Sequence, residues 1–339
     1  MRKTTSVPTF GTYSLRLVEE LREQGRFGTS LTYLKTRASF LSFITDVRLS
    51  EIDPDMIQRY NRYLVGRGVV RNTLSFYNRV LRAMYNKARK EYHFDDARPF
   101  EGVYTGIDRT SSRAVSEKSI ARLATMDLPE VRDRDALSLA RDMFLFSYAM
   151  RGMPFVDMAY LKKSQIRDGV LTYSRRKTGR TLRIKVEGEA LFIINKYSQK
   201  NSGSEYIFPI LDALGGRRQT GTAEAAYVRY SSALSLYNRN LRRLSSLAGI
   251  AEHLTSYASR HSWATAAQNM GSGISVISAA LGHSSERMTK IYLGNLNTVI
   301  IDITNRKLLD RLDKYCICSL NKKVRKVRTS QLSVSTKET

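Results

Sequence analysis

A histidine and a tyrosine near the C-terminus are of residue types, and at a spacing, that suit nucleophilic catalysis. His283 lies in the stretch LGHSSERMTKIYL, residues 281–293, and Tyr292 follows nine positions later. A tyrosine hydroxyl, with an ordinary pKa near ~10, is a poor nucleophile by itself. It attacks only where neighbours take its proton and neutralise the charge that develops on the target. The pair therefore predicts a nucleophile beside a proton-handling group, on a turn and a short helix.

Three further segments supply cationic side chains in a fixed order. Arg151 lies at a helix break in SYAMRGMPFVDMAYL, Lys177 in the turn RRKTGR, and Arg260 in LTSYASRHSWAT. Attack of a tyrosine on a phosphodiester passes through five-coordinate phosphorus with extra charge on its non-bridging oxygens. Guanidinium groups match this charge with paired hydrogen bonds. The set therefore indicates phosphoryl transfer, with Arg260 as the best candidate for one such contact.

In this order, Arg, Lys, Tyr-x-x-Arg, Gly-His and Tyr resemble the motifs of the tyrosine recombinases, the family of phage integrases and Xer-like resolvases. The resemblance covers the two-domain layout and nearly the whole chain, and its specific motifs lie between 145 and 293. It implies a site-specific recombinase that cleaves and rejoins DNA through a 3′-phosphotyrosyl intermediate and a free 5′-hydroxyl. Because that intermediate keeps the bond energy, the reaction should require no ATP, metal or cofactor.

The resemblance also implies a role for each matching residue. Lys177 would protonate the leaving 5′-oxygen, and His283 would hydrogen-bond the phosphate or assist proton transfer. Asp157 matches an acidic position that orients the active-site arginines, with an ordinary surface acid as the alternative. His261 is expected to be structural or to support the residues that contact the phosphate.

Two positions depart from the family pattern. Pro154 stands where the family has its first catalytic arginine. We expect Arg151, three residues earlier, to supply the missing guanidinium, with Arg183 or another arginine as the alternative. Tyr257 stands where the family usually has a histidine, three residues before Arg260. Because a phenol is a poor base at neutral pH, we expect Tyr257 to stabilise the phosphate rather than take a proton. Similar substitutions are a feature of a subgroup associated with bacterial mobile elements and invertible promoters.

The composition agrees with a nucleic-acid partner. The 339 residues include 56 lysines and arginines against 31 acidic residues, a formal charge of +25, which points to a polyanion such as DNA. A membrane surface is the alternative, but the sequence has no apolar run long enough to span a bilayer, and its first residues, MRKTTSVPTF, lack the apolar core expected of a signal peptide. A cytoplasmic, nucleoid-associated protein is expected. The two cysteines and four histidines lack the spacing of metal ligands.

The elements that would position these residues form two domains of mainly α structure. The sequence of residues 1–100 predicts a helical bundle with helices over 31–45, 53–66 and 72–90. Asn72 is expected to cap the last of these helices, and Ala38 is expected on the buried face of the first. The resemblance identifies this bundle with a core-binding, SAM-like domain. Residues 101–115 predict a linker, 116–312 the catalytic domain and 313–339 a basic tail.

The catalytic domain should contain both helices and a small antiparallel β-sheet. Helices are expected from Ser116 onward, over 136–150, after Pro154, and over 223–248 and 262–270. Strands over 170–173 and 181–186 flank the polar turn that holds Lys177, and a shorter strand is expected before Asp168. The resulting architecture would be a clamp, with one domain on each face of the duplex.

The helical domain carries a basic run that can follow a phosphate backbone. No acidic residue interrupts it, and four tyrosines, Tyr60, Tyr63, Tyr77 and Tyr85, are interleaved with it. A solvated surface is the usual explanation of such a run, but unbroken charge of one sign favours DNA binding. The basic residues are Arg59, Arg62, Arg67, Arg71, Arg79, Arg82, Lys87, Arg89 and Lys90.

The resemblance implies a homotetramer acting on two specific recombination sites, and it allows accessory DNA-bending proteins as further partners. A helix over 299–312 suits docking on a neighbouring subunit, or else covers a groove in its own chain. Integration, excision and inversion stay open, although no arm-binding domain is obvious before the bundle, which favours inversion or resolution.

Two other functions are possible: a type IB topoisomerase, which would relax DNA without a specific site, and a catalytically silent DNA-binding protein, which would form no adduct.

Overall fold

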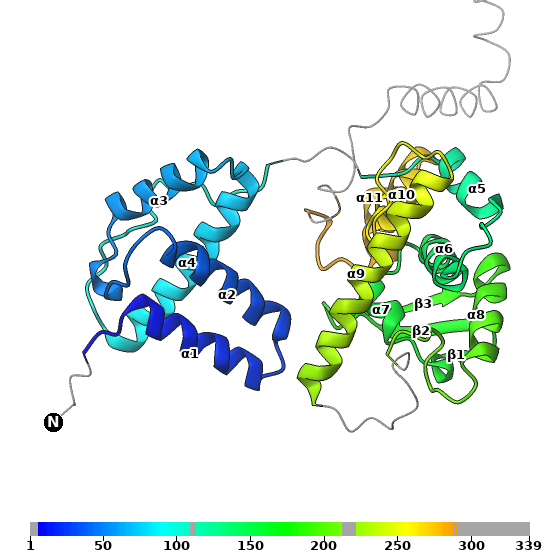
Figure 1. The fold of residues 1–339 in the computed structure, drawn as a ribbon, viewed down its shortest axis with the longest axis horizontal. Coiled ribbons are helices and arrows are strands. Elements are labelled where there is room, and N and C mark those ends of the chain that lie inside the picture. The colour runs from blue at the N-terminus through cyan, green and yellow to red at the C-terminus, as the bar shows by residue number, and fades with distance from the viewer. Residues whose placement is uncertain (1–5, 109–112, 212–221, 288, 290–339) are drawn as a thin grey trace, which may run out of the picture. The chain divides into compact units, whose positions relative to one another are not determined.

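The computed structural model describes residues 6–108, 113–211, 222–287 and 289. The chain divides into two compact units, unit 1 with residues 1–111 and 211–233 and unit 2 with residues 112–210 and 234–339. Both units are mainly helical in their described parts, and the described strands form one small sheet in unit 2 (Figure 1). The predicted fold class, mainly α with a small antiparallel sheet, is therefore confirmed. None of the described helices is long and apolar enough to cross a membrane.

Unit 1 forms around a core of aromatic side chains. Phe40 packs edge-on against Phe10 and Tyr60, with ring centroids 4.9 and 5.1 Å apart, and all three side chains are buried. Edge-to-face pairs of this kind add to the stabilisation that burial of the rings provides. The described helices of this unit are α1 (Phe10–Glu23), α2 (Phe27–Leu41), the short η1 (Leu49–Glu51), α3 (Pro54–Gly66) and α4 (Arg71–Tyr92).

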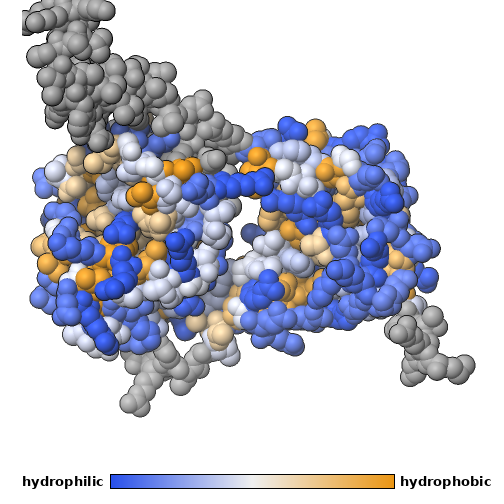
Figure 2. All heavy atoms as spheres, turned by 180° about the vertical axis from the view of Figure 1, so that it is seen from behind, coloured by the Kyte–Doolittle hydropathy of each residue, from blue (hydrophilic) through white to orange (hydrophobic). Residues whose placement is uncertain are grey.

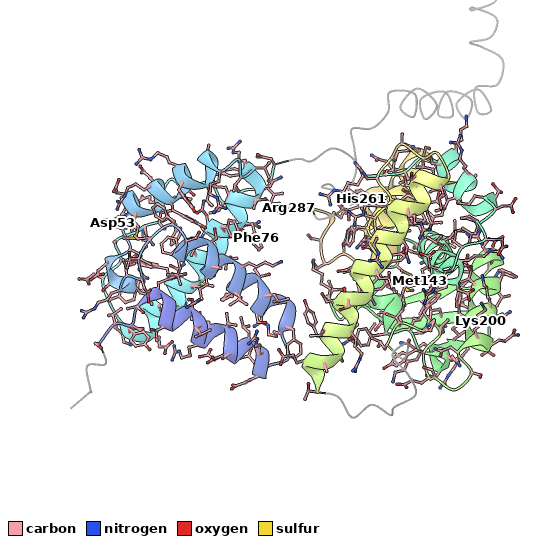
Figure 3. All side chains as sticks on the ribbon, in the orientation of Figure 1. Asp53, Phe76, Met143, Lys200, His261 and Arg287 are labelled. Carbon is pink, nitrogen blue, oxygen red and sulfur yellow. The ribbon has the colours of Figure 1, made fainter. Side chains whose placement is uncertain are left out.

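The sequence patterns placed three of these helices and missed α1. Helix α1 begins after a capping threonine, Thr9, and buries Tyr13 on its inner face, so its signals were present. Helix α3 follows Asp53 (Figure 3), which caps it, since the carboxylate accepts a hydrogen bond from the backbone N–H of Met56 at 2.7 Å. Helix α2 begins and ends earlier than predicted, and Ala38, which was expected to face inward, is exposed.

Asn72 does not have the predicted role of a helix cap. Val70 occupies the cap position of α4, and Asn72 lies within the first turn. Its side chain accepts from the backbone N–H of Asp108 at 2.7 Å and donates to the carbonyl of the same residue at 3.0 Å. Asn72 therefore fastens the segment that leaves the bundle to α4.

Unit 2 is built around a central helix, α6. Its described helices are α5 (Glu117–Thr125), α6 (Arg134–Ala149), α7 (Phe155–Ala159), the short η2 (Lys163–Gln165), α8 (Gly188–Lys200), α9 (Ala223–Leu247, of which residues 223–233 belong to unit 1), α10 (Ala258–Asn269) and α11 (Ile274–Leu281). Helices α5, α8 and α10 pack against α6. Met143 on α6 is buried, whereas Lys200 at the end of α8 is exposed (Figure 3). The expected cap at Ser116 is present, but α8 and α11 were not predicted.

The sheet consists of three antiparallel strands in chain order, β1 (Ile166–Arg167), β2 (Val170–Ser174) and β3 (Thr181–Lys185). Tyr173 pairs with Leu182, and both side chains are buried. Successive residues of a strand point to opposite faces, and Arg175, two positions beyond Tyr173, is also buried. The hairpin and the short strand before Asp168 agree with the prediction, and the turn of the hairpin contains Lys177.

Candidate active site and DNA-binding surface

A sharp turn after α6 positions one wall of the site. Arg151 and Gly152 both have left-handed backbone conformations, with φ of 58° and 68°. The N–H groups of Gly152 and Met153 both donate to the carbonyl of Ser147, at 2.7 and 3.1 Å. A Cβ on Gly152 would lie 2.6 Å from Cα of Arg260. Glycine is therefore required here, because it tolerates the positive φ and lets α10 approach closely.

Arg260 occupies the centre of the site on α10, with only 2% of its surface exposed. Its Nη1 donates to the carbonyl of Gly152 at 2.9 Å, and its Nη2 donates to the carbonyl of Leu281 at 2.6 Å. Nη2 also lies 3.0 Å from Nε2 of His283. These contacts fix the plane of the guanidinium and join the α6–α7 turn to the loop after α11.

His283 follows the left-handed Gly282 that ends α11. The ring is buried between Arg260 and Thr289, and Nδ1 lies 2.8 Å from Oγ1 of Thr289. Burial, reinforced by the nearby positive charges of Arg260, Arg175 and Lys177, lowers the pKa of His283 to about 4. The ring is therefore neutral at pH 7.

Arg175 is a buried member of the site that the sequence analysis did not include among its site residues. Its Nε pairs with Asp157 at 3.4 Å, and both side chains are buried. Its Nη1 donates to the carbonyls of Leu281 and Gly282 at 2.8 and 3.3 Å. Asp157 also accepts from the backbone N–H of Arg176 at 2.9 Å. The strand alternation of β2 was the signal that could have found Arg175, since it places this residue on the buried face after Tyr173.

The hairpin turn brings Lys177 to the same region. Lys177 is exposed, and its charge helps to lower the pKa of His283 after burial and the two arginines. Arg180, at the other side of the turn, donates to the backbone carbonyl of His283 at 2.7 Å. Arg183 lies on the exposed face of β3, opposite to the face that Leu182 buries.

Arg151 is half-buried, and its charge acts on the hydroxyl of Tyr173 together with those of Arg175 and Arg260. Burial raises the pKa of Tyr173, Asp157 raises it further, and the three arginines oppose the rise. The cationic side chains of the turn, the hairpin and α10 therefore converge around one buried phenol. Whether Arg151 replaces the arginine missing at Pro154 stays a prediction.

Tyr257 and His261 lie one helical turn apart at the start of α10, with ring centroids 5.8 Å apart. Both are half-buried. Burial, and then the charges of Arg113 and Arg260, lower the pKa of His261 to about 4. His261 therefore lies beside the arginine as a neutral ring. The proposed roles of Tyr257 and His261 stay predictions.

Tyr292 lies outside the described residues, as do the expected helix over 299–312 and the basic tail. Thr289, three positions before Tyr292, is described, helical and fully buried. Within the described residues, no group of three or more acidic, histidine or cysteine side chains could hold a metal ion. The described site therefore contains a dense group of guanidinium and ammonium charges beside a neutral imidazole.

The predicted DNA-binding residues lie on α3, on α4 and between them, and most are exposed. Although no acid interrupts them in the sequence, acids from outside the run pair with four of them in space. The pairs are Arg59–Asp55 at 2.9 Å, Arg71–Asp108 at 3.6 Å, Lys87–Glu20 at 2.8 Å and Arg89–Asp96. The surface is therefore less uniformly positive than the sequence indicated. Figure 2 shows apolar patches between hydrophilic residues on the face in view.

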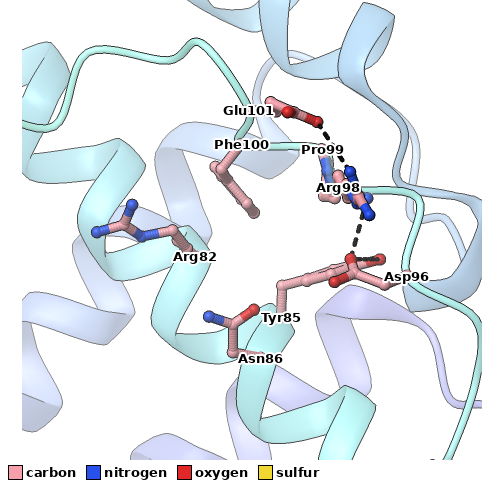
Figure 4. Close-up of a pocket in the computed structure, with 8 residues that line it drawn as sticks. All are labelled: Arg82, Tyr85, Asn86, Asp96, Arg98, Pro99, Phe100 and Glu101. Atoms are coloured by element: carbon pink, nitrogen blue, oxygen red, sulfur yellow. Dashed lines mark hydrogen bonds and ion pairs between the residues drawn. The ribbon is translucent and has the colours of Figure 1, made fainter.

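Two of the four interleaved tyrosines belong to the core rather than to this surface. Tyr60 and Tyr85 are buried, and the Tyr85 hydroxyl is directed toward Asp96 at 3.4 Å. Neither ring can stack on a base in this conformation. Next to Tyr85 lies a hollow of about 240 Å³, whose lining also includes Arg82, Asp96 and Glu101 (Figure 4). Charges of both signs line it, so it does not extend a purely basic surface.

Comparisons with known proteins agree with this geometry. The model of the phage integrase family matches residues 117–298, and that of the phage integrase SAM-like domain matches residues 9–101. Among curated protein sequences, none matches this chain.

Several solved structures have the same fold. A lambda integrase dimer bound to a COC′ core site is 15% identical, with a TM-score of 0.59, covering 84% of this chain and 95% of that one. A lambda integrase tetramer bound to a Holliday junction is 15% identical, with a TM-score of 0.61, covering 86% and 79%. The Tn1549 transposon integrase in complex with transposon right end DNA is 12% identical, with a TM-score of 0.59, covering 89% and 100%. The family match covers more than half of the chain, which therefore belongs to the phage integrase family and is a tyrosine site-specific recombinase.

Proposed function

We propose that this recombinase cleaves specific DNA sites by attack of Tyr292 on a phosphate held by Arg260, with His283, Lys177 and a second arginine around it. The single observation that carries the proposal is the contact of Arg260 with His283 inside a buried group of cationic side chains. Fixed hydrogen-bond donors in a buried site of low dielectric stabilise developing charge without reorganising. The neutral His283 ring adds no positive charge that would repel these arginines.

In the proposed step the phenolic oxygen of Tyr292 forms a bond to phosphorus, and the bond from phosphorus to the 5′-oxygen breaks. The proton of the phenol leaves to a neighbouring base or water, and Lys177 donates a proton to the 5′-oxygen. Rejoining is the same step in reverse, with a 5′-hydroxyl from another strand as the attacking group. Exchange of partners between two sites then yields inversion, integration or excision, according to how the sites are arranged.

The second arginine has two candidates. Arg151 lies on the α6–α7 turn, and its charge reaches Tyr173. Arg175 is more deeply buried, is oriented by Asp157 and lies next to the His283 loop. The hydrogen bonds of Arg175 to described residues use Nε and Nη1, and in this proposal the N–H groups of Nη2 would donate to a phosphate oxygen. Asp157 would thus act on Arg175, which fits the orienting role expected from the family.

We also propose that the chain acts as a homotetramer on two DNA sites, because lambda integrase forms a dimer on a core site and a tetramer on a Holliday junction. The test is the mass of the complex with duplex DNA after crosslinking. A complex with four protein chains and two duplexes is expected, and a complex that never exceeds two chains would contradict the proposal. Accessory DNA-bending proteins would be required only if purified protein and DNA fail to recombine.

The experiment that tests cleavage uses a duplex with a nick next to the scissile phosphate, made from inverted repeats that flank the gene. The short fragment between the scissile phosphate and the nick leaves with its 5′-hydroxyl, which removes the group needed for rejoining and traps the covalent intermediate. We expect a protein–DNA adduct that survives denaturation, and no adduct with Tyr292→Phe. Specific binding without any adduct would point to a catalytically silent DNA-binding protein. Relaxation of plasmids that lack the repeats would point to a topoisomerase, which the family match does not favour.

A further inference from the structure

The hydrogen bond between His283 and Thr289 has no role in the chemistry described so far. Thr289 has none of its surface exposed, and its Oγ1 lies 2.8 Å from Nδ1 of His283. The opposite side of the same ring faces Arg260, with 3.0 Å between Nε2 and Nη2. The imidazole is therefore held at both of its nitrogens, by residues from two different segments.

The two contacts determine which nitrogen carries the proton. A guanidinium offers only donors, so Nε2 of His283 must accept from Arg260. The neutral ring then has its proton on Nδ1, and Nδ1–H donates to the hydroxyl oxygen of Thr289. Without this acceptor, a buried Nδ1–H would lose its partner, and the ring would no longer be held against rotation.

We propose that Thr289 is a positioning residue for DNA cleavage, which holds His283 with its Nε2 acceptor turned toward Arg260 and joins the segment of the nucleophile to this pocket. The proposal rests on the proposed function of the site. Residues 286, 287 and 289 are helical, and Tyr292 follows Thr289 by three positions in the sequence. One hydrogen bond therefore orients the imidazole and anchors the chain just before the tyrosine.

A threonine packed only for its shape would be replaced by valine without loss, since the two side chains have nearly the same size. The informative pair of variants is therefore Thr289→Val, which removes the hydroxyl, and Thr289→Ser, which keeps it. We expect Thr289→Val to form the covalent adduct about ten-fold more slowly, the effect of one lost buried hydrogen bond. Thr289→Ser should stay within about two-fold of the wild-type rate. Equal rates for the two variants would overturn the proposal.

A double-mutant cycle separates this role from general damage to the fold. In a His283→Ala background the hydroxyl has no ring to hold, so Thr289→Val should slow the adduct less than about two-fold. A ten-fold loss in that background as well would show that valine disturbs the packing, and the proposal would fail.

Nitrogen-15 NMR of the full-length protein gives a second readout. A slowly exchanging Nδ1 proton on His283 is expected in wild type and Thr289→Ser and should be lost in Thr289→Val. Absence of any adduct with wild-type protein would instead contradict the proposed function.

Discussion

The resemblance to the recombinases predicts that Pro154 stands where the family has its first arginine, and two other arginines compete for that role. Pro154 is the N-cap of α7 and has an extended backbone directly before the first turn of the helix. Arg151 precedes it on a strained turn, and Arg175 reaches the pocket from the hairpin. Burial and contact with Asp157 favour Arg175, since a guanidinium already fixed in place loses less freedom when it binds a phosphate.

The first prediction concerns the substitution Arg175→Lys. Lysine keeps the charge but cannot make paired hydrogen bonds with Asp157 and a phosphate at once. We expect adduct formation on the nicked duplex to fall by about 100-fold, the loss typical of one removed transition-state donor. The matched control is Arg183→Lys, on the exposed face of β3, which should change the rate less than about two-fold. If Arg175→Lys retains the wild-type rate while Arg151→Ala loses the adduct, the role belongs to Arg151.

The second prediction concerns pH and His261. Its folded pKa of about 4 lies below the ordinary value of 6.5, so the unfolded chain binds a proton there at a higher pH than the folded protein does. The stability that this neutral ring contributes is present above pH ~6.5 and is lost as pH falls toward ~4. We therefore expect the Tm of wild type to fall relative to that of His261→Gln between pH 7 and 4.5. Parallel curves for the two proteins would show that His261 titrates normally.

At the scale of elements, the approach of α10 to the α6–α7 turn depends on Gly152. We predict that Gly152→Ala destabilises the protein by about 3 kcal/mol, because a Cβ there adds backbone strain and overlaps with Arg260. The control is Gly169→Ala, at the β1–β2 turn, where φ is 70° and no atom lies within 4 Å. That variant should cost only about 1 kcal/mol, from strain alone. Denaturant unfolding measures both, and equal losses would mean that the contact with Arg260 relaxes freely.

The order of the motifs allowed most of the candidate site to be predicted, and the elements explain the exceptions. The structure places Arg260 in contact with His283 and brings Lys177 to the same region, and the roles expected of the three residues stay predictions. Arg175 escaped because a basic residue in a polar turn looks like an exposed one, whereas contacts with Asp157 and with the carbonyls of Leu281 and Gly282 bury it. Helices α8 and α11 escaped because their short apolar runs carry no capping side chain. The contact with Leu281 joins residues 106 positions apart, and no pattern in the sequence around Arg175 can reveal it.

At the scale of the whole molecule, the formal charge of +25 favours binding to a polyanion. Ion pairs on the surface determine which cationic side chains are available to contact its phosphates. Arg59 pairs with Asp55 at 2.9 Å, whereas Arg62, on the same helix, has no ion pair among the described residues. Both side chains are exposed. Binding of DNA should therefore distinguish these two neighbours, although their sequence context is alike.

The last prediction tests this distinction by the salt dependence of binding to the duplex site. Each phosphate contact releases counterions and contributes about 0.9 to the slope of log affinity against log salt. We expect Arg62→Ala to reduce the magnitude of the slope by about 0.9. Arg59→Ala should change it less, because Asp55 already holds that guanidinium. Equal reductions would mean that DNA displaces Asp55 from Arg59. No reduction in either variant would mean that this face of α3 does not meet the backbone, and the basic run would then be an ordinary solvated surface.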